Sequence, residues 1–484
     1  MTIQNFSETD IKRRIKLDNR WWEIAEGIDQ FYKNFSARPY LNLLYPLISR
    51  IEIRRAVVLM GPRRVGKTVI LHHAIQKLID EGINPGNIFY AALDTPIFTN
   101  LHLEKILSYA IETSQADTSK VIYCFFDEIQ YLKDWETHLK SLVDTYRNYK
   151  FIVSGSAAAA LRLKSLESGA GRFTNFTLPP LTFYEYLELT NHGTLFKKES
   201  SKPFEGNYHY SASDLPIINE KFESYINFGG YPELLTNADL KSNMSRFVKS
   251  DIIDKVLLKD LPGLYGIQDI QELNSLFTKL AYNTGNEVSL DELSKNSGVA
   301  KNTIKRYLEY LEAAFLIFRL RRVDHSSKTF KRDNFFKIYL VNSTMRGALF
   351  SPISSSDANF GHLVETAILS QWFHSEIENN YYARWKTGEV DLISLEIQKP
   401  AWAVEIKWSN RVWSNPNEQL GGLISYCLEN NLQNPTVTTI DIHDRKIIDN
   451  ITIEYIPASV YCYTVGRNLI FGKKITSKKN AYSI

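Results

Sequence analysis

Residues 61–68 follow the pattern Gly-x-x-x-x-Gly-Lys-Thr, which is the spacing of a loop that binds phosphate groups. In such a loop, successive backbone N–H groups point at phosphate oxygens, with Gly61 and Gly66 at the turns. Lys67 would reach the β- and γ-phosphates, and the Thr68 hydroxyl would bind Mg²⁺. The rest of the predicted nucleotide-binding stretch is Arg64 and Val69.

A second pair of residues could supply the rest of this chemistry. Asp127 and Glu128 follow the apolar run 121–126, 60 residues after Lys67. Asp127 would hold the Mg²⁺, while Glu128 would orient and deprotonate the water that attacks the γ-phosphate. For residues 61–68 the alternative is a chance match in a glycine-containing turn. For Asp127 and Glu128 the alternative is a pair of acidic residues on the surface. An adjacent Glu is typical of ATPases, so we expect ATP and Mg²⁺ as cofactors.

Two further features could read the γ-phosphate. Ser154 and Ser156 follow the apolar run 151–153, and either could act as a sensor, although a turn of small residues is the simpler interpretation. Arg172 follows Gly169-Ala-Gly and could stabilise developing charge in its own or a neighbouring subunit. A surface ion pair would explain Arg172 equally well.

The elements around these residues predict how they are positioned. Apolar runs alternate with segments of helical spacing, which favours an α/β fold with a parallel, doubly wound sheet. Ligands of such sheets bind at the carboxyl ends of the strands, where these polar residues fall. Helical spacing follows the loop from 69 to 80, and the predicted strands are residues 56–60, 88–93, 121–126, 151–153 and 172–178.

The combination of motifs resembles a family of bacterial and archaeal AAA+ ATPases. The runs that carry this resemblance are GPRRVGKT, FFDEIQYLKDWE, VSGS, GRFTNFTLPPLTFYEYL and FGGYPE, and they spread over residues of about 50 to 410. Members of the family carry a C-terminal domain of unknown function with a core like that of restriction endonucleases. The resemblance therefore implies an AAA+ fold and ATPase chemistry for this chain.

The C-terminal part contains residues that resemble the PD-(D/E)XK nuclease core. Asp391 lies near the start of a predicted strand over 390–397, Glu405-x-Lys407 lies on the next predicted strand, 402–408, and Glu365 lies on an earlier helix. In that chemistry Asp391, Glu405 and Glu365 would bind Mg²⁺, and Lys407 would position a water or stabilise charge. A weak further candidate is Gln419. A Glu-x-Lys pair also occurs by chance on solvated strands, and such a fold can survive as a binding platform that does not cut.

One residue departs from the pattern of that family. Asn342, at the end of the predicted strand 336–341, stands where an acidic residue is usual. The four core residues are nonetheless all present, so the departure puts nuclease activity, rather than the fold, in doubt.

The middle of the chain predicts a winged helix-turn-helix. Ser289-Leu-Asp-Glu292 is a capping box that opens a short helix, and a second helix begins near Lys301 before a strand over 316–323. Residues 301–350 hold eleven Lys or Arg and four Asp or Glu, an excess that suits nucleic-acid contact. A structural lid of the ATPase is the alternative. The side chains expected to face DNA are Asn302, Thr303, Lys305 and Arg306.

Length and composition bound the remaining expectations. The chain has 484 residues, a net charge of +3 and three widely spaced cysteines, which fits a globular cytoplasmic protein of about three domains. We expect no membrane span, DNA as a partner, a possible protein partner and a possible homo-oligomer. The expected layout is a helical segment at 1–53, an AAA+ core at 54–180, a helical lid at 181–275, a winged-helix region at 276–345 and an endonuclease-like domain at 346–484.

Overall fold

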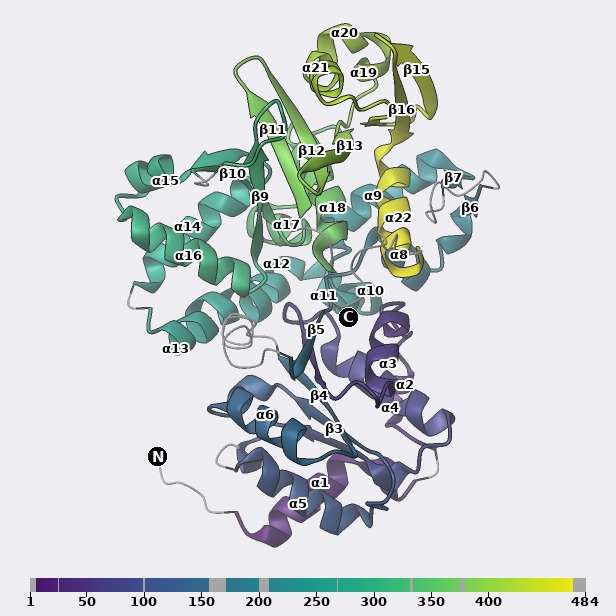
Figure 1. Ribbon diagram of the computed structural model, residues 1–484, viewed down its shortest axis with the longest axis vertical. Coiled ribbons are helices and arrows are strands. Elements are labelled where there is room, and N and C mark those ends of the chain that lie inside the picture. The colour runs from purple at the N-terminus through teal and green to yellow at the C-terminus, as the bar shows by residue number, and fades with distance from the viewer. Residues whose placement is uncertain are drawn as a thin grey trace. The chain divides into compact units, whose positions relative to one another are not determined.

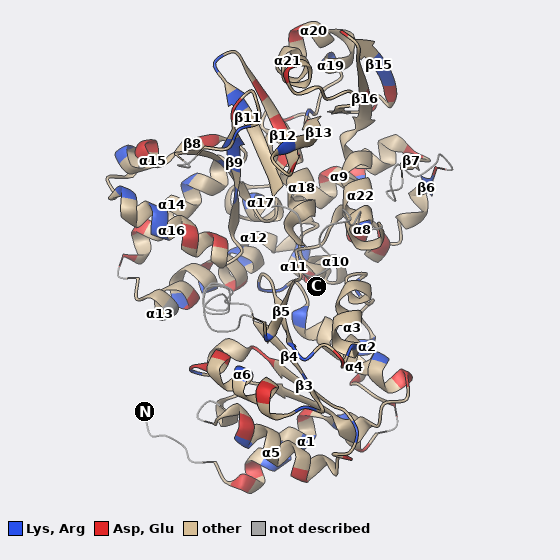
Figure 2. Cartoon of the chain, viewed as in Figure 1, with Lys and Arg blue, Asp and Glu red and all other residues tan. Residues whose placement is uncertain are grey.

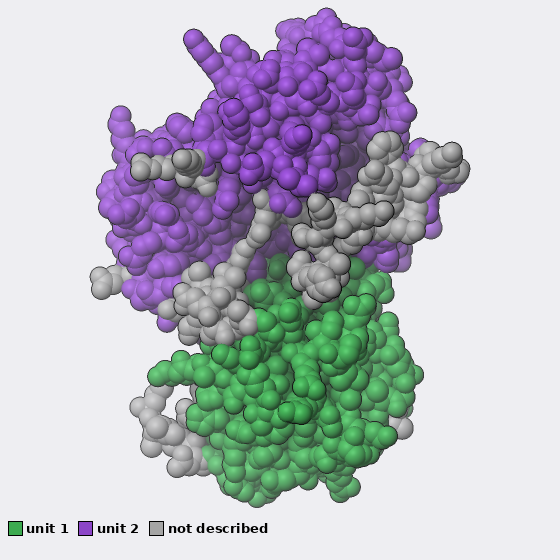
Figure 3. Space-filling model, in the orientation of Figure 1, with its two compact units in different colours: residues 1–178 green, residues 179–484 purple. Residues whose placement is uncertain are grey.

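The computed structural model divides the chain into two compact units (Figures 1 and 3), unit 1 with residues 1–178 and unit 2 with residues 179–484. Each unit is described by itself. The residues that the structure describes are 6–24, 26–98, 101–155, 171–199, 209–267, 269–330, 334–374 and 379–472.

Unit 1 is built on a five-stranded sheet in which every pair of neighbouring strands is parallel, which confirms the predicted α/β arrangement. The order across the sheet is β2-β3-β4-β1-β5. Apolar side chains fill these strands, so β1 and β3 are buried along their whole length. The strands are β1 (Ala56–Met60), β2 (Ile88–Ala92), β3 (Ile122–Asp127), β4 (Tyr149–Gly155) and β5 (Phe173–Thr177).

The helices of unit 1 pack in two groups around this sheet (Figure 1). Helix α5 packs between α1 and α6, whereas α4 packs against α2 and α3. The α-helices are α1 (Glu8–Asp18), α2 (Gln30–Lys33), α3 (Leu41–Ser49), α4 (Lys67–Asp80), α5 (Leu103–Ser114) and α6 (Trp135–Thr145). The short 3₁₀ helices are η1 (Arg20–Trp22), η2 (Pro85–Asn87), η3 (Pro96–Phe98) and η4 (Ile129–Tyr131).

The N-terminal segment covers the outer edge of β2. The fully buried Asn19 side chain accepts from the backbone N–H of Tyr90 at 2.7 Å and donates to the Tyr90 carbonyl at 2.8 Å, as a neighbouring strand would. The indole N–H groups of Trp21 and Trp22 both donate to the Ile88 carbonyl, at 3.0 and 2.9 Å. These contacts satisfy an edge strand that would otherwise present unpaired backbone groups.

Unit 2 contains a nine-stranded mixed sheet in the order β15-β16-β14-β13-β12-β11-β9-β10-β8. A separate antiparallel pair joins β6 (Phe196–Lys198) to β7 (Tyr210–Ala212). The strands of the large sheet are β8 (Glu287–Ser289), β9 (Ile317–Val323), β10 (Phe335–Leu340), β11 (Asn380–Trp385), β12 (Gly388–Glu396), β13 (Lys399–Glu405), β14 (Thr436–Thr439), β15 (Asp444–Ile448) and β16 (Ile451–Pro457).

Helices lie between and around these strands. The earlier ones are α8 (Phe183–Leu189), η5 (Gly193–Leu195), α9 (Leu215–Phe228), α10 (Pro232–Thr236), α11 (Ala238–Ser242), α12 (Met244–Arg246), the π-helical η6 (Phe247–Asp254) and η7 (Val256–Asp260), α13 (Leu261–Tyr265) and α14 (Ile270–Tyr282). The later ones are α15 (Leu290–Ser297), α16 (Lys301–Ala313), α17 (Thr344–Phe350), α18 (Phe360–Ser370), η8 (Gln371–His374), α19 (Arg411–Ser414), α20 (Pro416–Gln419), α21 (Gly421–Asn430) and α22 (Ala458–Phe471).

The large sheet runs through the expected border between a winged-helix region and a C-terminal domain. Strands β9 and β10 precede residue 345, yet β9 pairs in parallel with β11 beyond it. The expected border at 345 therefore does not coincide with a break in the sheet, and the domain layout stays a prediction. Among the described helices, none has the length and apolar character needed to cross a bilayer.

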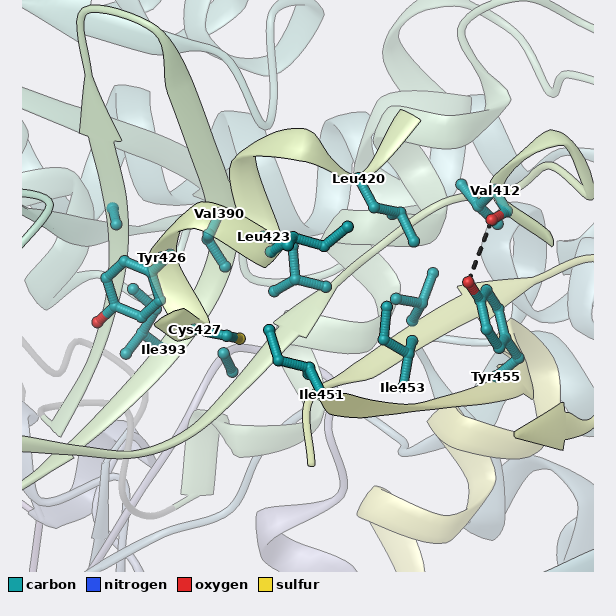
Figure 4. Packing of buried hydrophobic residues seen from close by; sticks show 14 of the residues in the cluster. Val390, Ile393, Val412, Leu420, Leu423, Tyr426, Cys427, Ile451, Ile453 and Tyr455 are labelled. Carbon is teal, nitrogen blue, oxygen red and sulfur yellow. Dashed lines mark hydrogen bonds between the residues drawn. The ribbon is translucent and has the colours of Figure 1, made fainter. Parts of the chain in front are cut away.

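The end of the large sheet packs on α21 through a cluster of buried apolar residues (Figure 4). Leu423 and Cys427 of α21 face strands β12 and β16, and every member of the cluster is at most 7 % exposed. The Tyr455 hydroxyl donates to the Val412 carbonyl at 3.3 Å, which gives this polar group a partner inside the apolar layer. This core holds the strands that carry Asp391 and Glu405.

Ile453 and Ile447 offer a matched pair of substitutions in this part of the sheet. Ile453 is fully buried on β16, whereas Ile447 on the neighbouring β15 is 73 % exposed. We expect Ile453→Ala to lower the free energy of unfolding by about 2–5 kcal/mol and Ile447→Ala to change it by about 0.5 kcal/mol or less. Urea unfolding followed by circular dichroism measures both. Equal effects would contradict the assigned faces of the two strands.

Candidate functional site

The predicted phosphate loop lies between the carboxyl end of β1 and the first turn of α4. A Cβ atom on Gly61 would lie 2.3 Å from the Leu178 carbonyl oxygen, so only glycine fits there. Gly66 has a φ of 91° and caps α4. The buried Lys67 ammonium donates to the carbonyl oxygens of Gly61 at 3.0 Å and Pro62 at 2.8 Å. The loop therefore holds a cation at a helix N-terminus, an arrangement suited to an anion.

Asp127 joins the loop to the sheet. It is the last residue of β3 and is 2 % exposed. Its Oδ2 accepts from the Thr68 hydroxyl at 2.6 Å and from the Tyr90 hydroxyl at 2.9 Å, and its Oδ1 accepts from the Ser154 hydroxyl. Side chains from α4, β2 and β4 thus converge on one carboxylate. Thr68 and Ser154 both contact Asp127, and their predicted contacts with Mg²⁺ and the γ-phosphate stay predictions. Ser156 lies outside the described residues.

Glu128 follows in a strained conformation, with a φ of 54°. Its backbone N–H donates to the Asp127 carboxylate at 3.1 Å and to the Ser154 hydroxyl at 3.2 Å, and its carboxylate accepts from the Gln130 side chain. Asp94 lies nearby, two residues beyond the end of β2. Burial, followed by the charges of Glu128 and Asp127, raises the pKa of Asp94 above its ordinary value. This end of the sheet therefore concentrates negative charge that a divalent cation would offset.

The side chains at this edge fit Mg²⁺. The Thr68 hydroxyl and the Asp127 carboxylate are hard oxygen donors within 2.6 Å of each other, and Mg²⁺ in proteins is commonly held by one or two such ligands together with phosphate oxygens. Arg64 is an exposed loop residue with a φ of 63°, and Val69 lies half-buried in the first turn of α4. Their predicted contacts with the nucleotide stay predictions.

Arg172 is not brought to the phosphate loop of its own chain. Strands β5 and β1 are parallel, and the Arg172 carbonyl accepts from the backbone N–H of Ala56, at the amino end of β1. The loop begins at the other end of that strand, about 16 Å away at ~3.3 Å per residue. The Arg172 guanidinium pairs with Asp144 at 3.1 Å, both side chains being exposed. An action across subunits stays a prediction.

In unit 2, the predicted acidic residues and Lys407 form one buried cluster. The Lys407 ammonium lies 3.0 Å from Asp391 Oδ2 and 2.7 Å from Glu405 Oε1. A second ammonium, that of Lys337 on β10, lies 3.1 Å from Glu365 Oε1 and 3.2 Å from Asp391 Oδ1. Lys337 also lies 2.7 Å from Glu389 Oε1, so two lysines and four carboxylates share the site. Glu365, Asp391 and Glu405 are each at most 7 % exposed, whereas the Glu389 side chain is 33 % exposed.

The charges of this cluster set its protonation. Burial disfavours ionised Asp391, but the ammonium groups of Lys407 and Lys337 hold the pKa of Asp391 well below its ordinary value. Burial and the neighbouring Asp391 raise the pKa of Glu405 to about 7. Burial also raises the pKa of Glu365, against the attraction of Lys337. Asp391 is therefore the fixed negative charge, and Glu405 can gain or lose a proton near neutral pH.

The strand that carries Glu405 ends earlier than the sequence predicts. We expected a strand to Trp408, but β13 ends at Glu405. The next two backbone N–H groups bind side chains instead: Ile406 donates to Asp391 Oδ2 at 3.0 Å, and Lys407 donates to the Thr438 hydroxyl at 2.8 Å. These bonds turn the chain out of the strand ladder and still bring the Lys407 ammonium back to Asp391.

The fit of this cluster to Mg²⁺ differs between its two halves. Glu405 Oε2 is buried and has no hydrogen-bond partner, so Asp391 and Glu405 offer oxygen donors of the kind that Mg²⁺ takes. Between Asp391 and Glu365, however, the Lys337 ammonium already supplies the positive charge. Among the described residues, no three His, Cys, Asp or Glu side chains gather as metal ligands. Gln419 is exposed at the end of α20.

Helix α16 presents part of the predicted DNA-facing set. Asn302, Lys305 and Arg306 are exposed and Thr303 is half-buried. Figure 2 shows acidic as well as basic segments on this helix. Several of the described basic residues in 301–350 are engaged inside unit 2, which reduces the charge available to a polyanion. They include Lys301 (with Asp291), Arg306 (with the Tyr310 hydroxyl), Arg319 (with Glu312), Arg322 (with Glu287 and the Arg384 carbonyl), Lys337 (with Glu365, Glu389 and Asp391) and Arg346 (with the Ser351 carbonyl).

Three residues that bind these clusters were not found from the sequence. Lys337 is the only charged residue of β10, so a cation within a buried strand was an available signal. Tyr339, on the same face two residues later, donates to Glu365 Oε1 at 2.6 Å. Tyr90 binds Asp127 from the middle of β2, and nothing in the apolar run distinguishes it from a packing residue.

The family models match two parts of the chain. Residues 53–187 match a family described as an AAA domain, and residues 219–357 match a domain of unknown function, DUF8612. The first match contains the phosphate loop, Asp127 and Glu128. It supports an ATP-binding P-loop domain in unit 1, in agreement with the parallel sheet.

Known relatives extend over most of the chain. An uncharacterized protein of Methanocaldococcus jannaschii is 25 % identical over 69 % of this chain and 71 % of its own length. One of Haemophilus influenzae is 24 % identical over 68 % of this chain and 76 % of its own length. Among solved structures, the Aeropyrum pernix Orc1 protein in complex with DNA matches at 11 % identity, covering 66 % of this chain and 94 % of that one, with a TM-score of 0.29.

His72, on α4 behind the phosphate loop, predicts an acid sensitivity of unit 1. Its ring stacks on Tyr32 at 3.6 Å, and burial lowers the pKa of His72 to about 3. In the unfolded chain a histidine side chain titrates near pH 6.5. The contribution of His72 to the free energy of unfolding is therefore fully present above that pH and is lost as pH falls towards 3, by about 1.4 kcal/mol per pH unit. We expect His72→Phe to flatten this part of the stability profile, measured by urea unfolding between pH 7.5 and 5.

His443, an exposed histidine, provides the control. His443→Phe should leave the pH dependence of stability unchanged. If His72→Phe and the wild type lose stability equally on acidification, protonation of His72 does not cause the loss of stability at low pH.

Proposed function

We propose that unit 1 binds and hydrolyses ATP. The observation that carries this proposal is the convergence of Thr68, Tyr90 and Ser154 on the Asp127 carboxylate. Thr68 follows Lys67, whose ammonium binds the Gly61 carbonyl of the loop. The match of residues 53–187 to an AAA domain supports it. Mg²⁺ bound beside Thr68 and Asp127 would supply positive charge to the β- and γ-phosphates.

The residues of the chain then have distinct roles. Backbone N–H groups of the loop and the Lys67 ammonium hold the phosphates, with Lys67 exchanging its carbonyl partners for phosphate oxygens. Glu128 accepts a proton from the attacking water, and the bonds from its N–H to Asp127 and Ser154 fix its backbone. Ser154 links the state of Asp127 to strand β4, which would let the sheet respond to the γ-phosphate.

A second function is proposed for unit 2: DNA binding together with Mg²⁺-dependent cleavage. Helix α14, strand β8, helices α15 and α16 and strands β9 and β10 follow one another in the order of a winged helix, with β10 between β8 and β9. The exposed side chains of Asn302, Lys305 and Arg306 suit phosphate and base contacts. Asp391, Glu405 and Lys407 together resemble the PD-(D/E)XK set, in which Lys407 would position the attacking water.

Two alternatives give unit 2 a different role. In the first, the protein is a nucleotide-switched regulator or scaffold whose C-terminal domain does not cut, and the Lys337 ammonium between Glu365 and Asp391 favours it. In the second, the ATPase acts on a protein partner. A setting in defence, repair or mobile-element biology and a cytoplasmic location belong to the same proposal.

Substitutions in the phosphate site separate binding from hydrolysis. We expect Lys67→Ala to abolish ATP binding measured by calorimetry, because the phosphates lose their cation. Glu128→Gln should keep binding and lower the rate of phosphate release by about 10²-fold or more, the usual contribution of a general base. Lys77→Ala, on the same helix α4, is the matched control. Tight ATP binding by the Lys67 variant would contradict the site.

Incubation of the full chain with DNA, Mg²⁺ and ATP distinguishes a nuclease from a scaffold. If unit 2 cleaves, Asp391→Ala and Lys407→Ala should abolish the cleavage, since they remove the negative charge for Mg²⁺ and the water-positioning cation. Asp444→Ala, an exposed position on β15, should cleave normally. Cleavage that survives in both variants would refute the proposed cluster, and no cleavage by the wild type would support the scaffold.

A further inference from the structure

A hollow lined by basic residues lies at the amino end of the sheet in unit 1. It sits where β1 and β4 begin and is open to solvent. The residues that line it include Arg54, Arg55, Arg147 and Lys150. Strands β1 and β4 are direct neighbours in the sheet, so these four cations come from two chain segments that the fold brings together.

Three of these cations lack an acidic partner. Among the described residues, neither Arg54, Arg55 nor Arg147 forms an ion pair with a carboxylate. The nearby Asp144 is already paired with Arg172 at 3.1 Å. Guanidinium groups that lie near one another without carboxylates repel one another. A bound anion would offset this repulsion, because each guanidinium attracts it.

Lys150 makes the hollow a built feature rather than a patch of flexible surface. The residue is 4 % exposed, and its ammonium donates to the carbonyl oxygens of Arg50 at 2.9 Å and Ile53 at 3.3 Å. Burial lowers the pKa of Lys150 to about 8, against the attraction of Glu52. A buried cation that has only neutral acceptors is stabilised when an anion binds beside it.

The nucleotide at the phosphate loop does not explain this hollow. Strands β1 and β4 are parallel, so their amino ends lie at the opposite edge of the sheet from Gly61 and Asp127. Five residues of β1 separate the two edges, about 16 Å at ~3.3 Å per residue. The two clusters of positive charge therefore serve different anions, or different parts of a long one.

We propose that the hollow of Arg54, Arg55, Arg147 and Lys150 is a second phosphate site, separate from the nucleotide site. Its ligand is a phosphate group, either as the free ion or as a phosphodiester of a nucleic acid. A planar guanidinium group can donate two parallel hydrogen bonds to two oxygens of one phosphate group, whether that group is the free ion or part of a phosphodiester. The half-buried rings of Tyr146 and Tyr149, 5.0 Å apart, also line the hollow and offer surfaces on which an unstacked base could lie.

The test compares the full-length wild type with an R54Q/R147Q variant, because both side chains are exposed and tolerate substitution. One arm titrates inorganic phosphate by calorimetry, and the other titrates a labelled single-stranded oligonucleotide by fluorescence anisotropy. A weakening of about tenfold or more is expected for the ligand that the site takes. If that ligand is the oligonucleotide, the variant should also show a shallower dependence of affinity on salt.

Two controls keep the result specific. R13Q removes an exposed arginine of α1 outside the hollow and should bind like the wild type. ATP binding should be unchanged in R54Q/R147Q, so that a failure of the nucleotide site and a failure of this site are distinguishable. The proposal is overturned if the wild type binds neither ligand, or if R54Q/R147Q and R13Q bind both ligands as tightly as the wild type does.

Discussion

The hydrogen bonds that the buried Asp127 carboxylate accepts are the interactions on which the rest of unit 1 depends. It is buried at the end of β3 and accepts hydrogen bonds from side chains of α4, β2 and β4 and from the backbone N–H of Glu128. A buried charge is tolerated only when it is paired or bonded in this way. One carboxylate therefore fixes the first turn of α4, strands β2 and β4 and the proposed catalytic base relative to one another.

Unit 2 solves a similar problem by a different route. Its buried carboxylates lie beside two ammonium groups, Lys337 and Lys407, so that charge is compensated within the cluster. The compensation is uneven, because Asp391 contacts both lysines while Glu405 keeps one oxygen without a partner. The two ammonium groups hold Asp391 ionised, whereas burial and the charge of Asp391 raise the pKa of Glu405 to about 7.

Much of unit 1 could be predicted from the sequence, since its signals are local. The loop glycines, Lys67 and the apolar runs specify a strand, a turn and a helix without reference to distant residues, and Asp127 follows from the same strand pattern. Arg172 shows the limit of this reasoning. Its neighbourhood suggested the nucleotide, but the parallel pairing of β5 with β1, a long-range property, carries it to the other edge of the sheet.

The candidate site of unit 2 was less predictable because its residues meet through pairing between distant strands. Glu365, Asp391, Glu405 and Lys407 were identified and do meet, yet Lys337 and Tyr339 reach them from a strand assigned to another part of the chain. The early end of β13 depends on Asp391 and Thr438, which are far from it in sequence. The periodicity of the sequence cannot show where side chains, rather than a neighbouring strand, accept the backbone hydrogen bonds of a segment.

The most direct measurement of the central claim is a calorimetric titration of the wild type and of Asp127→Asn with ATP, each with and without Mg²⁺. If the Asp127 carboxylate is the junction between loop, metal and sheet, the wild type takes up one ATP per chain and binds it more tightly with Mg²⁺, and the variant loses that dependence on the metal. Equal ATP affinity for both proteins under both conditions would contradict the account.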